Sequence, residues 1–348
     1  MNKKKIMVTG GAGFIGVNLV IELLKNKNNF VVVFDNLSRK GTENNLNYLL
    51  SQKYKNLEFV KGDIRDYNQL KDVMQECKEI YHLAAQVAVT KSVEDPVEDF
   101  KINAEGTLYL LEATRKVVPE AIFTFASTNK VYGALSHIKL KEGKKRYLLC
   151  SKRKGVSEKE CLDLYSPYGV SKGVADQYVR DYHRIYGLKT IVFRQSCIYG
   201  KFQYGNEDQG WVAHFIIKSI LDGKLNIYGD GKQIRDLLEV SDLVKAYLSA
   251  VKKIKKTEGK IYNIGGGADN TLSLLEFIEL LKGSLKLDIE YSFSDWRPGD
   301  QKVFVSDNSK LETEVGWKPK ISKEKGIEQL TGWIWKNISL IEKVNKKK

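Results

Sequence analysis

The chain has 348 residues, 42% of them hydrophobic and 29% charged, which is ordinary for a globular protein and enough for two modest domains. The net charge of +14 arises from 57 basic and 43 acidic residues without an aromatic-interleaved basic patch, so nucleic acid is not an expected partner. The apolar run after Gly16 is broken by Asn18 and Glu22, which excludes it as a membrane span.

The first half of the chain alternates strand-like and helix-like segments. Strands are expected at residues 6–9, 30–34, 57–61, 79–83, 121–126 and 189–193, and helices at residues 14–24 and 100–117. Continuous apolar strands that alternate with helices are typical of a parallel sheet covered on both faces. The predicted fold class is therefore α/β, with a doubly wound parallel sheet.

The second half departs from this alternation. Residues 136–166 are charged and irregular, and we expect them to form an insertion or flap. Further helices are expected at residues 212–221 and 272–281, and further strands at residues 262–264 and 289–293. The predicted division is a nucleotide-binding domain over residues 1–195, with a return segment at about 237–264, and a smaller C-terminal substrate-binding lobe made of residues 196–236 and 265–345.

A glycine-rich turn follows the first expected strand and precedes the first expected helix. Gly10, Gly13 and Gly16 form a Gly-x-x-Gly-x-x-Gly pattern, which permits a tight turn and close approach of the backbone to a pyrophosphate. Asp35 closes the second strand, where a carboxylate binds ribose hydroxyls and repels a 2′-phosphate. The pattern predicts a Rossmann-type sheet that binds NAD rather than NADP, although Arg39 nearby leaves NADP open.

Other cofactor contacts are expected at the carboxyl ends of the next strands. Asp63 is placed to meet the adenine amino group, unless it is only a turn carboxylate. Ala84 and Ala85 let the chain pass close to a dinucleotide, and simple packing explains them almost as well. The full set of expected cofactor-binding residues is Gly10, Gly13, Phe14, Ile15, Gly16, Asp35, Asn36, Ser38, Arg39, Asp63, Ile64, Leu83, Ala84, Ala85, Gln86, Asn103, Tyr168 and Lys172.

Tyr168 and Lys172 form a Tyr-x-x-x-Lys pair, which places both side chains on one face of a helix. An ammonium group beside a phenol favours the phenolate and lowers its pKa from about 10. A depression of about three units, to which a bound nicotinamide's charge could contribute, would make Tyr168 a usable base. A surface Tyr and Lys on an amphipathic helix is the plain alternative, but the glycine turn favours the catalytic interpretation.

Cysteine and histidine spacing indicates no metal site. The cysteines, at positions 77, 150, 161 and 197, are far apart without a Cys-x-x-Cys pair, which suggests free thiols in a reducing compartment. The four histidines show no metal-ligand spacing either. We therefore expect a cytoplasmic, metal-free protein without a signal peptide, whose basic surface can attract an anionic substrate.

From Thr9 to Trp333 the chain resembles the extended short-chain dehydrogenase/reductase superfamily. The segment from Ser127 to Gly133 matches that superfamily's Ser/Thr-x-x-Val-Tyr-Gly pattern. The resemblance implies that Thr128 is a third catalytic residue, whose hydroxyl bonds the reacting oxygen and relays its proton towards Tyr168. The plain alternative for Thr128 is a threonine cap at a strand end.

Within the superfamily the chain is most similar to the CDP-paratose 2-epimerases. The stretches that carry this resemblance are residues 34–41, 127–133, 166–172, 175–178, 208–211 and 300–305. The resemblance implies epimerisation at carbon 2 of CDP-paratose, giving CDP-tyvelose, for polysaccharide biosynthesis, and a homo-oligomer (dimer or tetramer). Related 4,6-dehydratases carry Asp-Glu where this chain has Asn129 and Lys130. Many relatives carry Asn at the position of Cys197, a poor hydrogen-bond donor.

A diphosphate sugar needs cationic anchors, for which arginine is suited. Arg235 and Arg297 match the superfamily's phosphate-binding arginines, although each could be a surface Arg–Asp pair. The expected substrate-binding residues are Thr128, Asn129, Gln195, Ser196, Trp211, Tyr228, Arg235 and Arg297. Core packing of Tyr228 and Trp211 is about as compatible with the sequence. Another nucleotide-sugar epimerase, such as a UDP-hexose 4-epimerase, and a non-catalytic dinucleotide-binding protein remain the competing hypotheses.

Overall fold

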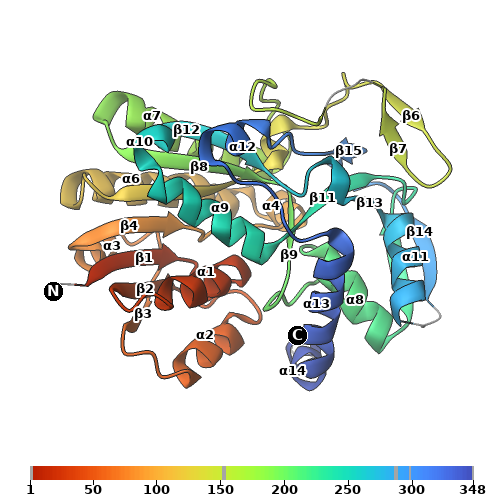
Figure 1. The fold of residues 1–348 in the computed structure, drawn as a ribbon, viewed down its shortest axis with the longest axis horizontal. Helices are drawn as coiled ribbons and strands as arrows, with labels where there is room; N and C mark the ends of the chain where they lie inside the picture. Colours follow the sequence, from red (N-terminus) through yellow and green to blue (C-terminus); the bar gives the residue numbers. More distant parts are fainter. Residues whose placement is uncertain (1–2, 151–153, 286–288, 298, 347–348) are drawn as a thin grey trace.

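A seven-stranded parallel sheet forms the centre of the computed structural model, which describes residues 3–150, 154–285, 289–297 and 299–346 (Figure 1). The strand order is β12-β8-β5-β4-β1-β2-β3, and every pair is parallel. The strands are β1 (Lys4–Thr9), β2 (Asn29–Asp35), β3 (Leu57–Lys61), β4 (Cys77–His82), β5 (Ile122–Thr128), β8 (Lys189–Gln195) and β12 (Lys260–Ile264). The predicted α/β fold class is confirmed.

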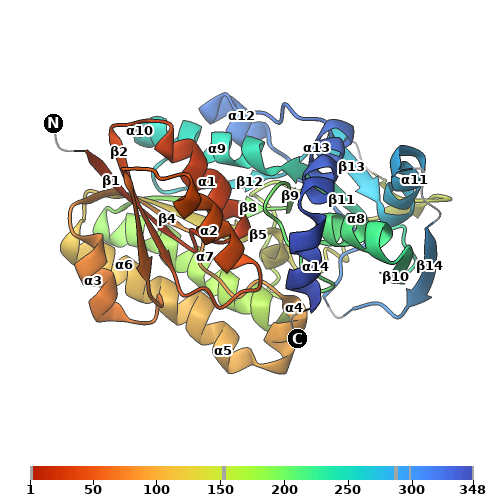
Figure 2. The same cartoon turned by 90° about the horizontal axis from the view of Figure 1, so that it is seen from below.

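Helices cover both faces of this sheet (Figure 2). One face carries α1 (Phe14–Leu24), α2 (Thr42–Ser51), α9 (Val240–Lys252), α10 (Ile254–Thr257) and α12 (Ser309–Val315). The other face carries α3 (Tyr67–Met74), α4 (Val89–Glu94), α5 (Pro96–Phe100), α6 (Gly106–Val117) and α7 (Ser166–Tyr186). Because both faces are covered, strand residues such as Val31, Val32 and Val33 are buried in succession.

The C-terminal lobe lies at one end of the large sheet and has its own apolar core. Its strands are β9 (Cys197–Tyr199), β10 (Lys224–Tyr228), β11 (Ile234–Glu239), β13 (Thr271–Ser273), β14 (Glu290–Ser294) and β15 (Val303–Phe304). Its helices are α8 (Trp211–Leu221), η3 (Ala268–Asn270), α11 (Leu274–Leu285), α13 (Lys323–Lys336) and α14 (Ile338–Lys346). β11 joins β13, β15 and β9, whereas β10 pairs only with β14 among the described strands.

The return segment links the lobe back to the large sheet. After β11, helix α9 packs on α1, and β12 then becomes the edge strand beside β8. The chain therefore crosses between the two parts more than once, as the predicted return segment at about 237–264 requires. We retain the predicted domain division as a proposal that follows this connectivity.

The long helix expected at residues 100–117 is interrupted. A π-helical turn, η1 (Lys101–Glu105), separates α5 from α6. Asn103 lies in this turn and donates to the Gln86 carbonyl oxygen at 3.0 Å and to Asp99 at 3.0 Å. Wide helical turns of this kind are frequent at functional sites, because they re-aim one side chain.

The charged insert is more ordered than its sequence suggests. It contains an antiparallel hairpin of β6 (Leu140–Glu142) and β7 (Tyr147–Leu149), while residues 151–153 lie outside the described part of the chain. Arg146 of the hairpin pairs with Glu276 of α11 at 2.7 Å. The Tyr147 backbone N–H donates to the Lys232 carbonyl oxygen at 3.1 Å. The hairpin is therefore bound to the C-terminal lobe.

Candidate active site

The glycine turn between β1 and α1 is packed too tightly against its own backbone and the end of β4 to accept side chains at Gly10 and Gly16. Gly10 has φ +68°, and a Cβ there would lie 2.7 Å from the Ala84 backbone nitrogen. A Cβ at Gly16 would lie 2.2 Å from the Gly10 carbonyl oxygen. Gly13 is the N-cap of α1 and brings no side-chain cap, so the first N–H groups of the helix are open to an anion. The turn therefore fits a pyrophosphate.

Replacing Gly16 by alanine is expected to weaken dinucleotide binding at least about tenfold and to destabilise the fold by about 1–3 kcal/mol. The added methyl group meets backbone atoms of Gly10 and Gly11, which must shift. Gly332→Ala in α13 is the matched control, because no atom lies within 4 Å of its Cβ position. Dinucleotide titration and urea unfolding of both variants measure the two effects, and equal behaviour of the variants would contradict this account.

A cleft of about 560 Å³ lies above the glycine turn. Every predicted cofactor-binding residue lines it except Asn103, which lies behind Gln86 in the hydrogen-bond network of the π turn. The Asp35 carboxylate accepts from the backbone N–H groups of Ala12 at 3.0 Å and Leu37 at 2.8 Å. Burial raises the pKa of Asp35, and these hydrogen bonds oppose that rise.

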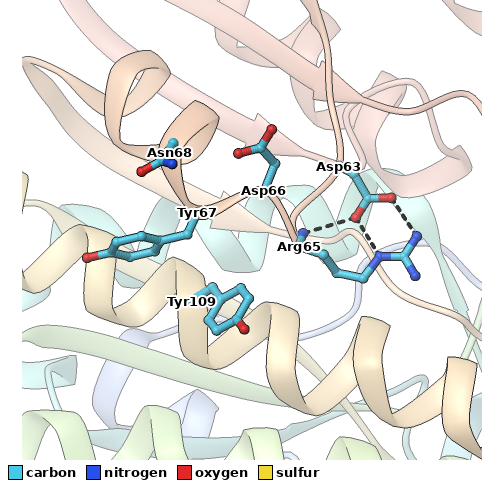
Figure 3. A pocket seen from close by; sticks show the side chains of 6 residues that line it. All are labelled: Asp63, Arg65, Asp66, Tyr67, Asn68 and Tyr109. Carbon is cyan, nitrogen blue, oxygen red and sulfur yellow. Dashed lines mark hydrogen bonds and ion pairs between the residues drawn. The ribbon is translucent and has the colours of Figure 1, made fainter.

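Asp63 lies at the outer end of this cleft, where a shallow hollow opens between α3 and α6 (Figure 3). Arg65 donates to both Asp63 carboxylate oxygens, at 2.9 and 2.8 Å, and also pairs with Glu98 at 2.8 Å. Hydrogen bonding to Arg65 lowers the pKa of Asp63 to about 2. The Asp63 carboxylate is therefore ionised and already held by Arg65, and its contact with an adenine amino group stays a prediction.

Arg39 contacts a loop of the C-terminal lobe. Its guanidinium donates to the Gln209 side chain. Its charge also acts on Tyr168, where it opposes part of the rise in pKa that burial causes. Gln209 belongs to the loop that borders both this cleft and the neighbouring cavity. Arg39 thus connects the cofactor end of the site to the loop of the C-terminal lobe.

Thr128, Tyr168 and Lys172 meet in the inner part of the cleft. Thr128 ends β5, and its side chain caps η2 (Asn129–Tyr132) by accepting from the Lys130 N–H at 3.2 Å. Tyr168 and Lys172 lie one turn apart near the start of α7, and both are buried. Burial raises the pKa of Tyr168, and a hydrogen bond with Thr128 opposes part of that rise. The sequence-predicted triad is therefore assembled from two elements.

In the protein alone, the expected lowering of the Tyr168 pKa by Lys172 is wrong. Burial raises the pKa of Tyr168 to about 12, and Asp99 adds to the rise, against the opposing effects of Thr128 and Arg39. Burial also lowers the pKa of Lys172 to about 7, with Asp176 and Asp99 opposing. The Lys172 ammonium lies 4.2 Å from the Phe125 ring centre. The effect of burial on the Tyr168 pKa is therefore larger than the lowering that was expected from Lys172 on the same helix face.

A buried ion pair that the sequence did not reveal fixes the helix of the triad against the sheet. Arg194 of β8 donates to both carboxylate oxygens of Asp176 on α7, at 2.9 and 2.8 Å. Ser127 of β5 donates to the same carboxylate at 2.7 Å. Asp176 is one turn beyond Lys172, and Ser127 precedes Thr128. This network therefore holds β5 and α7, which carry the triad, together. The sequence did not predict it, because its residues are not neighbours in the chain.

A second cavity, of about 410 Å³, lies between the cleft and the C-terminal lobe. We call it the substrate cavity. Trp211, Tyr228, Arg235 and Arg297 line it, as predicted for substrate-binding residues, and Lys130 joins them. Thr128, Gln195 and Ser196 line the cofactor cleft instead. Asn129 lines neither: its amide donates to Gln301 at 3.1 Å.

Cationic and aromatic side chains that line the substrate cavity contact one another. The Arg297 guanidinium lies 3.7 Å from the Tyr228 ring centre and donates to the Glu207 carbonyl oxygen at 2.8 Å. Trp211 packs edge-on against Phe277, with ring centres 5.1 Å apart. Burial raises the pKa of Cys197 to about 12, so its thiol stays neutral. The pocket thus pairs a cation with an aromatic face at the lobe side.

Two further observations concern only the described residues. No helix among them is long and apolar enough to cross a membrane. No group of three or more His, Cys, Asp and Glu side chains in this part of the chain could hold a metal ion.

The glycine turn, the parallel sheet and the Thr–Tyr–Lys arrangement define an enzyme of the extended short-chain dehydrogenase/reductase class. The chain belongs to the family described as GDP-mannose 4,6 dehydratase, whose signature matches residues 7–330. Known proteins similar to this chain are nucleotide-sugar epimerases and dehydratases.

Known proteins resemble this chain over nearly its whole length. A CDP-paratose 2-epimerase from Salmonella typhi is 42% identical over 336 residues, which cover 94% of this chain and 98% of that protein. A dTDP-glucose 4,6-dehydratase from Haemophilus influenzae is 31% identical over 361 residues, covering 96% and 98%. The structure of UDP-glucuronic acid 4-epimerase from Bacillus cereus, in complex with UDP-glucuronic acid and NAD, superposes with a TM-score of 0.83 at 29% identity, covering 95% and 99%.

Proposed function

We propose that this protein is an NAD-dependent epimerase that converts CDP-paratose to CDP-tyvelose by inverting carbon 2. The observation that carries the proposal is the place of Thr128, Tyr168 and Lys172, in the cleft beside a cavity that contains three cationic side chains. The 42% identity with the Salmonella typhi CDP-paratose 2-epimerase, over nearly all of both chains, supports the cytidine nucleotide and carbon 2.

The cofactor part of the proposal rests on the glycine turn and Asp35. The turn offers open helix N–H groups to a pyrophosphate, and Asp35 offers a carboxylate to ribose hydroxyls. The NAD bound to the Bacillus cereus relative supports the same cofactor here. NAD, when bound, supplies a reversible hydride acceptor, so one complete cycle involves no net oxidation.

The side chains act in both halves of the proposed reaction. Tyr168 accepts the proton of the carbon-2 hydroxyl while a hydride leaves the same carbon, which gives a ketone. Thr128 hydrogen-bonds the reacting oxygen throughout. Arg235 and Arg297 hold the diphosphate while the sugar turns about its link to it. Hydride then returns to the opposite face of carbon 2, and Tyr168 returns the proton to the oxygen.

The residues after Thr128 support epimerisation over loss of water. Dehydration needs an acid and a base beside the sugar, and related dehydratases carry Asp-Glu at this point. Here the Asn129 amide is bound to Gln301, and the Lys130 ammonium donates to the Gly299 carbonyl oxygen at 2.8 Å. Neither side chain is a carboxylic acid, so the proposed chemistry ends at the ketone and its reduction.

A second candidate is a UDP-hexose 4-epimerase, which the Bacillus cereus UDP-glucuronic acid 4-epimerase supports through its similar fold. It needs the same Thr128, Tyr168 and Lys172, and differs in the nucleotide and in which carbon faces Tyr168. A non-catalytic dinucleotide-binding protein would have no use for this buried triad, so it is the least supported alternative.

Incubation of the purified protein with CDP-paratose, followed by NMR of the carbon-2 proton, tests the proposal. We expect inversion at carbon 2 without accumulation of a reduced or dehydrated sugar. Inversion of UDP-glucose or UDP-glucuronic acid at carbon 4, with none of CDP-paratose, would replace the proposal by the second candidate. A 4-keto-6-deoxy product from a dTDP- or GDP-sugar would refute epimerisation.

Self-association is part of the same proposal. Val93, Val97 and Phe100, on α4 and α5, are 54%, 61% and 51% exposed, and Val170 on the neighbouring α7 is 42% exposed. Apolar side chains gathered on adjacent helices support an interface between copies of this chain. Light scattering of the protein measures whether it is the expected dimer or tetramer.

A further inference from the structure

Lys130 is a substrate-cavity residue that was absent from the predicted substrate-binding set. It lies two residues after Thr128, on η2, and its side chain is 20% exposed. Its ammonium donates to the Gly299 carbonyl oxygen at 2.8 Å and lies 3.8 Å from an oxygen of Asp300. Lys130 thus joins the β5 end of the triad to the loop that carries Arg297.

A second cation lies close enough to this lysine to act on it. Arg235 of β11 lines the same cavity, repels Lys130 and is attracted by the same Asp300 carboxylate. Asp300 therefore attracts both cations, and the carboxylate of Asp236 also attracts Arg235.

The other charged or titratable groups of the cavity lining are Glu207, Asp208, His214, Tyr228 and Arg297. Glu207 pairs with Arg297 at 3.4 Å, and Asp208 accepts from the Thr90 hydroxyl at 2.8 Å. Burial lowers the pKa of His214 to about 4, so it is neutral at pH 7. The charges that act on Lys130 itself are those of Arg235 and Asp300, and no group of the opposite wall is among them.

Burial lowers the pKa of Lys130 to about 8, with repulsion from Arg235 acting in the same direction and Asp300 opposing. An anion placed between Lys130 and Arg235 would reverse part of this shift, because it favours the charged amine. The amine is then protonated more fully with ligand than without it at pH 8 and above.

We propose that Lys130 contacts the diphosphate of the bound nucleotide ligand together with Arg235, and that the lysine takes up a proton as this ligand binds. This inference deepens the proposed function, because it rests on a nucleotide diphosphate occupying the substrate cavity. Related dehydratases carry a carboxylic acid at the position of Lys130, which acts on the sugar. In this chain, the lysine at that position would bind the diphosphate.

Calorimetric titration of the dinucleotide-bound protein with CDP, UDP and dTDP, between pH 7.5 and 9.5, tests the proposal. This range lies above the last phosphate pKa of about 6, so the phosphate charge is constant. The pH profile is read on CDP, because the uracil and thymine rings of UDP and dTDP lose a proton near the upper end of the range. The diphosphate that binds most tightly is expected to lose affinity as pH rises past 8. Titrations in two buffers of different ionisation enthalpy should show proton uptake on binding.

Two variants separate charge from structure. Lys130→Met is expected to weaken binding at least about tenfold at pH 7.5, as for loss of one charge-assisted hydrogen bond, and to remove the proton uptake. Lys130→Arg is expected to keep binding and to lose its dependence on pH, because arginine does not titrate in this range. Lys172, with its pKa lowered to about 7 by burial, is unchanged in both variants, so its own titration cancels in the comparison.

Lys232→Met is the matched control, because Lys232 pairs with Glu142 of the hairpin and does not line the cavity. It should bind like the wild type. Unchanged affinity and pH profile in Lys130→Met would overturn the inference while leaving nucleotide binding intact. So would proton uptake that persists in Lys130→Arg, which remains testable if Lys130→Met does not fold. Failure of the wild type to bind any of the three diphosphates would overturn the proposed function as well.

Discussion

Tyr168→Phe is expected to lower kcat by about 10³-fold while leaving the fold and the bound dinucleotide in place. General acid–base catalysis by one positioned side chain contributes about 10²–10⁴-fold. The phenol is buried beside Thr128, and in the proposed reaction it moves the proton to and from the sugar hydroxyl. Phenylalanine keeps the ring and removes only that oxygen.

The measurement is the rate of carbon-2 inversion by NMR, together with the amount of dinucleotide bound to each purified variant. Tyr186→Phe is the matched control, because Tyr186 ends the same helix with half of its side chain exposed. It should retain wild-type activity. If Tyr168→Phe turns over within a few-fold of the wild type, Tyr168 is not the acid–base group.

Arg194→Met is expected to destabilise the protein by about 3–5 kcal/mol, because it leaves the Asp176 carboxylate buried without its cation. Arg194 and Asp176 have 4% and 0% of their side chains exposed. After the substitution, Ser127 and Gln177 are the donors to that carboxylate that remain within the described part of the chain. Since Asp176 follows Lys172 on α7, activity should fall together with stability.

Urea unfolding measures the loss, and two further variants interpret it. Arg115→Met removes an Arg–Glu pair at the surface of α6 and should leave the unfolding midpoint close to the wild type. Arg194→Met combined with Asp176→Leu should recover part of the stability, because no charge is then buried alone. A double variant as unstable as the single one would show that lost packing, and not the unpaired carboxylate, causes the effect.

Several parts of the fold could be predicted from local pattern alone. The helix at residues 14–24 and the strand at 57–61 were predicted with the bounds that the structure has. The helix follows a glycine turn, and the strand is a short, mostly apolar run, so both are signalled locally. Helices α9 and α13 were not predicted, although α9 carries apolar residues at helical spacing, Val240, Leu243, Val244 and Tyr247. Helix α9 packs against α1, and α13 packs in the lobe core.

The π turn around Asn103 and the hairpin of the charged insert also required the tertiary structure. Asn103 interrupts a helical pattern because its amide reaches Gln86, Asp99 and Ser171, which are far from it in sequence or on another helix. The hairpin is held by ion pairs such as Arg146 with Glu276, which no local periodicity signals.

The sequence by itself determined the family, the parallel sheet and the residues that line the cofactor cleft, because glycine turns and strand ends are local features that recur at fixed spacing. Only the tertiary structure decided the electrostatics. It shows that burial raises the pKa of Tyr168 and lowers those of Lys172 and Lys130. These shifts depend on how much water the surrounding elements exclude and on which charges they bring near, and neither quantity is encoded in the spacing of a motif.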